Sequence, residues 1–226
     1  MSRSGPFGIF LDLLFPPRCV FCKGILKRGE AGLCARCQQE LPWILGESAE
    51  QSGEFFSLCV SPLWFQGEVR ESIHRYKFSD RNGYAKVYGR LVAQCVQDHL
   101  AGRYDLITWV PLSADSLKKR GYDQAMLLAM ATALALDDVA VETLKKVRNT
   151  QAQSGLKEDA ARRANVMGAY EITDPMLVEG KRILLIDDVV TTGSTLTECS
   201  RTLRTYGATD VVCATLARAR GERPKK

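Results

Sequence analysis

The 226-residue sequence has no apolar run long enough to cross a membrane, which takes about 20 consecutive apolar residues. The apolar stretch Phe7 to Phe15 is too short, carries Asp12 and lacks a small-x-small cleavage site, so it is not typical of a signal peptide. We therefore expect a cytoplasmic protein. Its 46% hydrophobic and 25% charged residues are typical of a soluble chain with one good core and a small extra module.

The sequence also lacks a large excess of one charge over most of its length. The net charge is +5, and the segment Arg218 to Lys226 holds five basic residues and one acid, so the remainder is close to neutral. We expect residues 218–226 to form a disordered basic tail rather than a dedicated binding arm. Between residues 70 and 90, however, six cations face only Glu71 and Asp80. They are Arg70, Arg75, Lys77, Arg81, Lys86 and Arg90.

The most informative pattern present lies near the C-terminal end. Residues 182–186, with an unbroken apolar run from Ile183, predict a parallel strand that is buried on both faces. Two acids, Asp187 and Asp188, follow this strand. A small, hydroxyl-rich turn comes next, made of Thr191, Thr192, Gly193, Ser194 and Thr195.

This turn can surround a phosphate with backbone N–H groups, with the positive end of a helix dipole behind them. The two carboxylates can accept hydrogen bonds from a sugar diol, so the pattern favours a phosphorylated ribose. An ordinary strand-to-helix turn with solvated acids is the alternative. Thr195-x-x-Glu198 reads as a capping box, which predicts a helix from Thr195 to about Gly207, and residues 210–216 read as the next strand.

These residues resemble the phosphoribosyl-pyrophosphate (PRPP) motif of type I phosphoribosyltransferases: four apolar residues, two acids, two variable positions and Thr-Thr-Gly-x-Thr. The resemblance implies that Asp187 and Asp188 hold the ribose 2′ and 3′ hydroxyls. It also implies that the turn from Thr191 to Thr195 wraps the 5′-phosphate. No Gly-Lys-Ser/Thr follows the glycine, so the turn is not a Walker loop.

Two Cys-x2-Cys pairs form a second strong pattern. Cys19 and Cys22 are followed, after eleven residues, by Cys34 and Cys37, a spacing that can bring four thiolates to one tetrahedral zinc. Four protein ligands leave no open position, so the zinc would be structural, and its binding would supply folding energy to this short segment. Disulfides are the alternative, and they are uncommon in a cytosolic protein.

The rest of the chain alternates helical and strand patterns. Residues 84–100 and 122–136 predict helices around a buried strand at 105–112, and the second helix is apolar on nearly all sides, so we expect it to be buried against the sheet. Residues 38–55 lose the apolar periodicity. We therefore predict a zinc-binding module at 1–50 and an α/β domain with a parallel sheet at 51–217.

A basic segment separates the predicted strand from the second helix. Ser113 begins this segment, and Lys118, Lys119 and Arg120 end it at the carboxyl edge of the strand. A pyrophosphate-facing loop is our interpretation, with a solvated loop as the alternative. Residues 148–168 form a long polar connection, for which a lid closing over PRPP is the functional interpretation.

Six features in order look like the ComF family, which includes GntX-type proteins and is linked to competence and the use of external DNA. They are Phe15-Pro-Pro-x-Cys with its paired knuckles, His74-Arg-Tyr-Lys-Phe78, Val110-Pro-Leu112, Arg120-Gly-Tyr-Asp-Gln124, Thr150-x-x-Gln153-x-x-Leu156, and the motif ending in Leu216-Ala-Arg218. The resemblance implies a Rossmann-like type I phosphoribosyltransferase domain with an N-terminal four-cysteine zinc module. The pair Tyr122-Asp123 departs from the commoner Phe-Asn, which puts a catalytic role there in doubt.

Two functions follow as hypotheses. The first is a PRPP-binding phosphoribosyltransferase in DNA uptake, in which Asp187 and Asp188 fix the sugar, Lys119 and Arg120 assist the pyrophosphate, and Mg²⁺ neutralises the leaving group. Its acceptor is not evident. The second is a single-stranded DNA-binding module with a regulatory or vestigial PRPP pocket, working alongside other competence proteins. Its candidate contacts are Arg75, Lys77 and Arg81, with Tyr76, Phe78 and Tyr84 as stacking or core aromatics.

Overall fold

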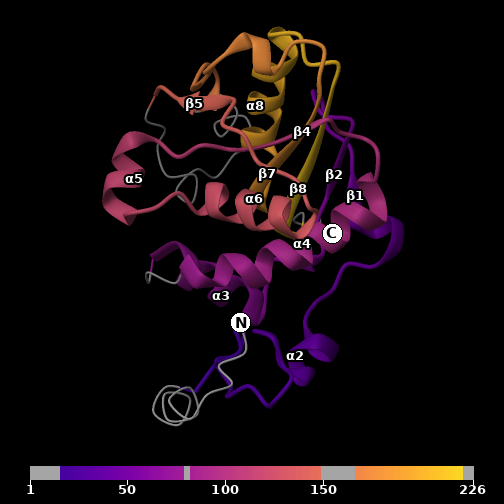
Figure 1. Cartoon of the computed structure of the whole chain (residues 1–226), viewed down its shortest axis with the longest axis vertical. Helices are drawn as coiled ribbons and strands as arrows, with labels where there is room; N and C mark the ends of the chain where they lie inside the picture. Colours follow the sequence, from indigo (N-terminus) through magenta and orange to yellow (C-terminus); the bar gives the residue numbers. More distant parts are fainter. Residues whose placement is uncertain (1–15, 79–81, 149–165, 221–226) are drawn as a thin grey trace, which may run out of the picture.

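A mostly parallel sheet forms the centre of the computed structural model, which describes residues 16–78, 82–148 and 166–220 (Figure 1). Its strand order is β1-β2-β8-β7-β4, with β3 pairing with β8 beyond the end of β2, and only β1 runs antiparallel to its neighbour. The bounds are β1 Glu50–Gln51, β2 Leu58–Val60, β3 Leu63–Trp64, β4 Leu106–Trp109, β7 Arg182–Val190 and β8 Asp210–Arg218. The expected α/β class with a parallel sheet is confirmed.

The two central strands are buried on both faces. Along β7, Leu184 and Ile186 join the core on one face of the sheet, while Ile183 and Leu185 join the core on the other. Both strands are longer than the sequence predicted. The ladder between them continues to the pair Val190 and Arg218, so Asp187 and Asp188 lie inside β7 rather than after it. The reason is that β8 stays alongside and supplies backbone partners beyond the apolar run.

Helices cover both faces of this sheet (Figure 1). On one side α4 packs against α6, and both contact the sheet; on the other side α8 packs on β7 and β8 together with the antiparallel pair β5 and β6. The bounds are α4 Ala85–Leu100, α5 Ala114–Arg120, α6 Gln124–Ala135, α8 Ser194–Thr205, β5 Leu144–Lys146 and β6 Tyr170–Ile172, with short 3-10 turns at Gly46–Ala49, Asn82–Tyr84 and Pro175–Leu177.

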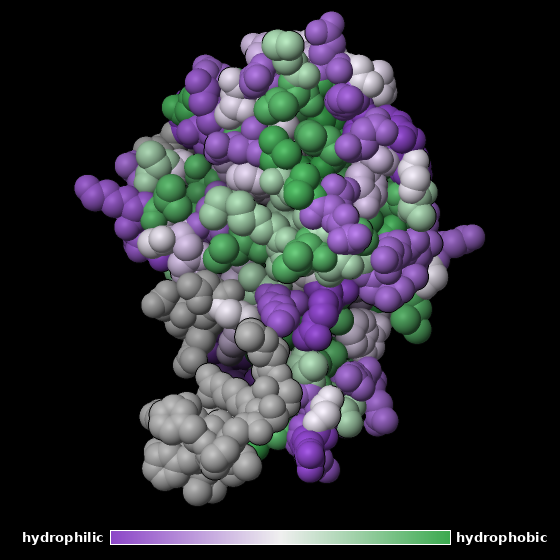
Figure 2. Space-filling view, viewed as in Figure 1, coloured by the Kyte–Doolittle hydropathy of each residue, from purple (hydrophilic) through white to green (hydrophobic). Residues whose placement is uncertain are grey.

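Helix α6 is less buried than its composition predicted. Leu128 and Ala129 are fully buried, but Met130 is 45% exposed and Leu134 is 79% exposed. Apolar residues also lie on the surface over the region where Figure 1 draws α6 (Figure 2). As expected, α6 packs against the sheet, but it touches the sheet and α4 through one part of its circumference, so apolar residues on the rest of the helix are exposed.

The N-terminal cysteine module packs against α3 (Gly67–Phe78) and α4, on the side of the sheet that α4 covers. It contains α2 (Ala35–Glu40) and lies beside α3 (Figure 1). Phe21 packs on Tyr88 of α4, with ring centroids 5.6 Å apart, and belongs to the same buried cluster as Ile73. The module and the sheet domain therefore share one core. The boundary predicted at residue 50 falls within β1, and the domain limits remain a prediction.

The first residue of the predicted basic tail is part of the sheet. Arg218 ends β8 and is buried, with its guanidinium 4.8 Å from the centroid of the Trp64 ring. It donates hydrogen bonds to the carbonyls of Ser48 and Glu50. Residues 221–226 of the predicted tail, residues 149–165 of the lid predicted at 148–168, and Arg81 lie outside the described residues. None of the helices in the described ranges combines the length and apolarity of a membrane span.

Gly89 allows α4 and α6 to approach closely. A Cβ added at this position would lie 2.6 Å from the carbonyl carbon of Ala131. The G89A substitution should therefore lower the free energy of unfolding by about 1–3 kcal/mol, because backbone cannot move aside as a flexible side chain can. Urea unfolding measures this, with G83A as the matched control, since an added Cβ at Gly83 meets no atom within 4 Å. Equal stability of the two variants would contradict the close approach.

Candidate functional site: a four-thiol cluster and the carboxyl end of the central strand

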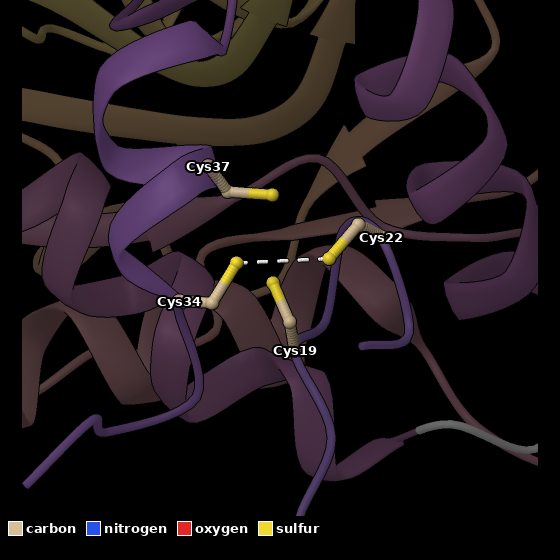
Figure 3. A group of neighbouring side chains, drawn as sticks. All are labelled: Cys19, Cys22, Cys34 and Cys37. Carbon is tan, nitrogen blue, oxygen red and sulfur yellow. Dashed lines mark hydrogen bonds between the residues drawn. The ribbon is translucent and has the colours of Figure 1, made fainter. Parts of the chain in front are cut away.

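Four cysteine side chains converge in the N-terminal module. The sulfur atoms of Cys19, Cys22, Cys34 and Cys37 all lie within 4.8 Å of one another, and none forms a disulfide (Figure 3). The set of four thiols in this arrangement fits the donor chemistry of a structural zinc. The prediction of a metal site is confirmed over the disulfide alternative, and all four ligand positions are filled by protein.

Local backbone structure places the thiols. The N–H of Cys19 donates to the carbonyl of Gly24, and Lys23 donates back to the carbonyl of Cys19, which closes the first knuckle. Cys34 is the N-cap of α2 and Cys37 lies within that helix. Burial raises the pKa of Cys22, but hydrogen bonds from Gly24 and the neighbouring thiols outweigh it and lower the pKa to about 7. Burial raises the pKa of Cys34 and Cys37, so four thiolates in this cluster require a cation such as zinc beside them.

Purified protein should contain one zinc per chain, and a strong chelator should destabilise it because the module shares a core with α3 and α4. A Cys34→Ser variant should lose the metal, whereas Cys95→Ser, which alters a thiol outside the cluster, should keep it. Metal analysis with thermal unfolding checks both. Metal-free protein with an unchanged melting temperature would contradict a structural role.

The second cluster lies at the carboxyl end of β7. The Asp188 N–H donates to Oδ1 of Asp187 at 2.8 Å, and Asp188 is 4% exposed. The chain then turns at Gly193, whose φ of +79° is strained for any residue with a side chain, and α8 begins at Ser194. The turn from Thr191 to Thr195 therefore lies at the N-terminus of a twelve-residue helix, with the Thr192 and Ser194 hydroxyls 2.8 Å apart.

The predicted capping box at Thr195 does not form. Gly193 is the N-cap, and no side chain caps α8. Glu198 instead accepts a hydrogen bond from the N–H of Gly168 at 2.6 Å and pairs with Arg201 at 2.7 Å. Glu198 thus joins α8 to the segment before β6. The N-terminus of α8 is the positive end of its dipole, which suits an anion site.

Water is removed from around Asp187, and this raises its pKa to about 8, with Asp188 and Asp123 contributing in the same direction. Lys77 acts the other way. The neighbouring acid Asp123 caps α6, accepting from Ala125 and Met126, and also accepts from Leu112. Burial raises the pKa of Asp123 as well. The unusual acid at this position therefore has a structural task at the exit of β4.

Lys77 is the residue that sequence reasoning did not place at this site. Its Nζ lies 2.7 Å from Asp188 Oδ2, although the two residues are 111 positions apart. The sequence predicted Lys77 as a nucleic-acid contact. Its position in the motif His74 to Phe78 was the available signal, but only the packing of α3 shows which acid it faces.

The predicted pyrophosphate loop is a helix. α5 starts after Ser113, whose side chain accepts from the N–H of Ser116, and ends at Gly121 in the left-handed conformation. The loop prediction was wrong, because these two residues are ordinary helix start and stop signals. Lys118 and Lys119 are exposed in the last turn, while Arg120 donates to Gln124 and lies over the Phe78 ring.

The basic cluster at 70–90 divides between structural and exposed residues. Arg75 donates to the carbonyls of Val20 and Phe21. Tyr76 is a core residue with no exposed surface, and Tyr84 packs on Tyr88, so the core alternative holds for Tyr76. Phe78 is 55% exposed. The assignments of individual PRPP, pyrophosphate and nucleic-acid contacts remain predictions.

Two family models match the chain. A phosphoribosyl transferase domain covers residues 118–226, and a double zinc ribbon domain covers residues 10–59. The second range contains the four clustered thiols, and the first contains β7, its two acids and the turn into α8. Fold and site therefore define a phosphoribosyltransferase-domain protein with an N-terminal zinc ribbon.

Similarity to individual relatives narrows the class. Competence protein F of Haemophilus influenzae is 31% identical over 223 residues, which is 89% of this chain and 97% of the relative. DNA utilization protein YhgH of Salmonella typhi is 34% identical over 81% of this chain and 78% of its own length. Competence protein ComFC of Streptococcus pneumoniae is 25% identical over 66% of this chain and 63% of its own length. The chain belongs to the competence protein F family.

The raised pKa of Asp187 predicts a pH-dependent stability difference. The folded protein retains a proton that the unfolded chain loses between about pH 4 and pH 8, so stability falls as the pH rises through this window. An Asp187→Asn variant has no such proton. As the pH rises through this window, the free energy of unfolding of the variant should increase relative to that of the wild type by up to about 1.4 kcal/mol per pH unit, as measured by urea unfolding.

Asp105→Asn provides a control of opposite sign. The Arg182 guanidinium lowers the pKa of Asp105 to about 2, so this substitution should destabilise the protein at neutral pH. An Asp187→Asn variant that is less stable than the wild type at about pH 7.5 would contradict the unfavourable burial of the Asp187 charge.

Proposed function

We propose that this protein binds PRPP with Mg²⁺ at the carboxyl end of β7 and acts in the cytoplasm in the uptake or use of external DNA, alongside other competence proteins. The observation that carries the binding proposal is the juxtaposition of the buried Asp188 and the half-buried Asp187 with the N-terminus of α8. Support for the DNA role comes from sequence similarity to proteins named for competence and DNA utilization.

Different residues of the site would bind the ribose, the 5′-phosphate and the pyrophosphate of PRPP. Asp187 and Asp188 would accept hydrogen bonds from the ribose 2′ and 3′ hydroxyls, and the backbone N–H groups from Thr191 to Thr195 would hold the 5′-phosphate. The pyrophosphate would lie toward the exit of β4, near Ser113 and the last turn of α5 with Lys118, Lys119 and Arg120. Mg²⁺ bound by the ribose hydroxyls and the pyrophosphate would neutralise the leaving group.

Calorimetric titration of zinc-replete protein with PRPP and Mg²⁺ tests this proposal. We expect binding that the double variant Asp187→Ala/Asp188→Ala loses by at least about 100-fold, since both diol acceptors are removed. Asp98→Asn, an exposed acid on α4, should bind as the wild type does. Undiminished affinity in a folded double variant would refute the assignment. Pyrophosphate release with candidate acceptor bases tests transfer separately.

A groove favours single-stranded DNA as a second candidate ligand. It has a volume of about 500 Å³ and lies between the first zinc knuckle and α3, lined by Lys23, Gly67, Arg70, Glu71, His74 and Arg75. Beyond it, the His74 ring packs against the half-exposed Phe78, with centroids 4.8 Å apart. Cations beside an exposed ring suit a phosphate backbone with stacking bases.

Fluorescence anisotropy with a labelled oligothymidylate tests the groove. The double variant Lys23→Ala/Arg70→Ala should weaken binding about tenfold and reduce its salt dependence, because two phosphate contacts are lost. Lys86→Ala, an exposed cation on α4 outside the groove, should have little effect. Binding that is undetectable, or that does not depend on salt, would count against this candidate.

A further inference from the structure

Lys77 is the cation that the described part of the protein pairs with the acids of the motif. Its ammonium lies 2.7 Å from Asp188 Oδ2, and the Asp188 side chain is 5% exposed while that of Lys77 is 24% exposed. Ionised carboxylates are costly to bury unless a counter-charge accompanies them. The ammonium therefore neutralises Asp188, while the Lys77 side chain stays partly exposed to solvent.

This ammonium serves more than one carboxylate. Asp188 raises the pKa of both Asp187 and Asp123, so three acids lie within electrostatic reach of one another. Lys77 favours the ionised form of Asp187, as does the partly buried Lys146 of β5. A sugar diol can also satisfy carboxylate oxygens, because hydroxyl groups donate hydrogen bonds to them. The hydroxyl groups of a diol would therefore compete with the ammonium for the oxygens of Asp188.

The backbone that carries Lys77 is held on both sides. Tyr76 is buried, its hydroxyl donates to the Gln124 carbonyl at 2.8 Å, and its own carbonyl accepts from the Tyr122 hydroxyl. Arg75 donates to the Phe21 carbonyl at 2.6 Å. The Lys77 side chain, in contrast, is a flexible four-carbon stem with a point charge at its end. The ammonium can consequently move while the helix end stays in place.

We propose that Lys77 is a ligand-binding residue of the PRPP site. When the ribose diol occupies Asp188, the Lys77 ammonium moves from that carboxylate to an oxygen of the pyrophosphate group. The inference rests on the proposed PRPP binding and adds to it a determinant of selectivity. Lys77 then distinguishes PRPP from a ribose phosphate that carries no pyrophosphate, because only PRPP offers the released ammonium a new anionic partner.

The test compares PRPP with ribose 5-phosphate, each titrated calorimetrically with Mg²⁺ into wild type and Lys77→Met. We expect the variant to weaken PRPP binding about tenfold or more and ribose 5-phosphate binding less than about threefold. Lys86→Met, which removes an exposed cation of α4, should leave both affinities unchanged.

Each other result overturns the inference. Equal losses for the two ligands would mean that Lys77 only supports Asp188, equal gains would mean that it only blocks the site, and unchanged affinities would mean that it contacts neither ligand. If the wild type binds PRPP and Lys77→Met binds it equally well, only this role of Lys77 is refuted. Absence of wild-type PRPP binding removes the proposed function together with it.

A second comparison applies if Lys77→Met does not fold. Lys77→Met/Asp188→Asn leaves no unpaired charge, so it should be better tolerated than the single loss of the lysine. Against the background of Asp188→Asn alone, the added loss of Lys77 should still lower the ratio of PRPP affinity to ribose 5-phosphate affinity about tenfold. An unchanged ratio would overturn the inference.

Discussion

Two adjacent carboxylates held inside the central strand β7 are the constraint on which the rest of the site depends. The ladder with β8 continues past Asp187 to Val190, so the sheet fixes the backbone of both acids, as it would not fix that of a loop residue. The loss of water and their mutual repulsion raise the pKa of Asp187. The protein offsets this cost with Lys77 at Asp188. A ligand that brings hydroxyl donors, a cation and phosphates could complete the compensation.

Helix α3 connects this site with the four-thiol cluster. Near its middle, Ser72 and Arg75 donate to carbonyls of the first knuckle, and at its end Lys77 contacts Asp188. A metal that fixes the knuckle would thereby also fix the carbonyls on which α3 rests. The zinc ribbon and the phosphoribosyltransferase domain are therefore mechanically joined rather than separate units on a linker, and the shared core around Phe21 and Tyr88 has the same consequence.

Local patterns predicted the elements whose cause is local. The run from Ile183 to Ile186 is apolar because both faces of β7 are covered, and the paired cysteine spacing indicated one shared metal site. Local patterns gave wrong predictions where a residue of the pattern has another function in the folded protein. Glu198 has capping-box spacing from Thr195, yet it pairs with Arg201 one turn further along α8 and binds Gly168, which the fold brings to it. The segment after Ser113 was read for its charge, although its cap residues predict a helix.

The sequence by itself determined the chemistry: which acids, hydroxyls and thiols are present, and their order along the chain. A spacing of a few residues survives folding, because the strand, turn and knuckle that contain it are formed from neighbouring residues. Only the tertiary structure decided which distant groups meet, such as Lys77 with Asp188 or Arg75 with the first knuckle. Such contacts join separate helices and strands, and their geometry follows from packing of the whole core, which no local pattern encodes.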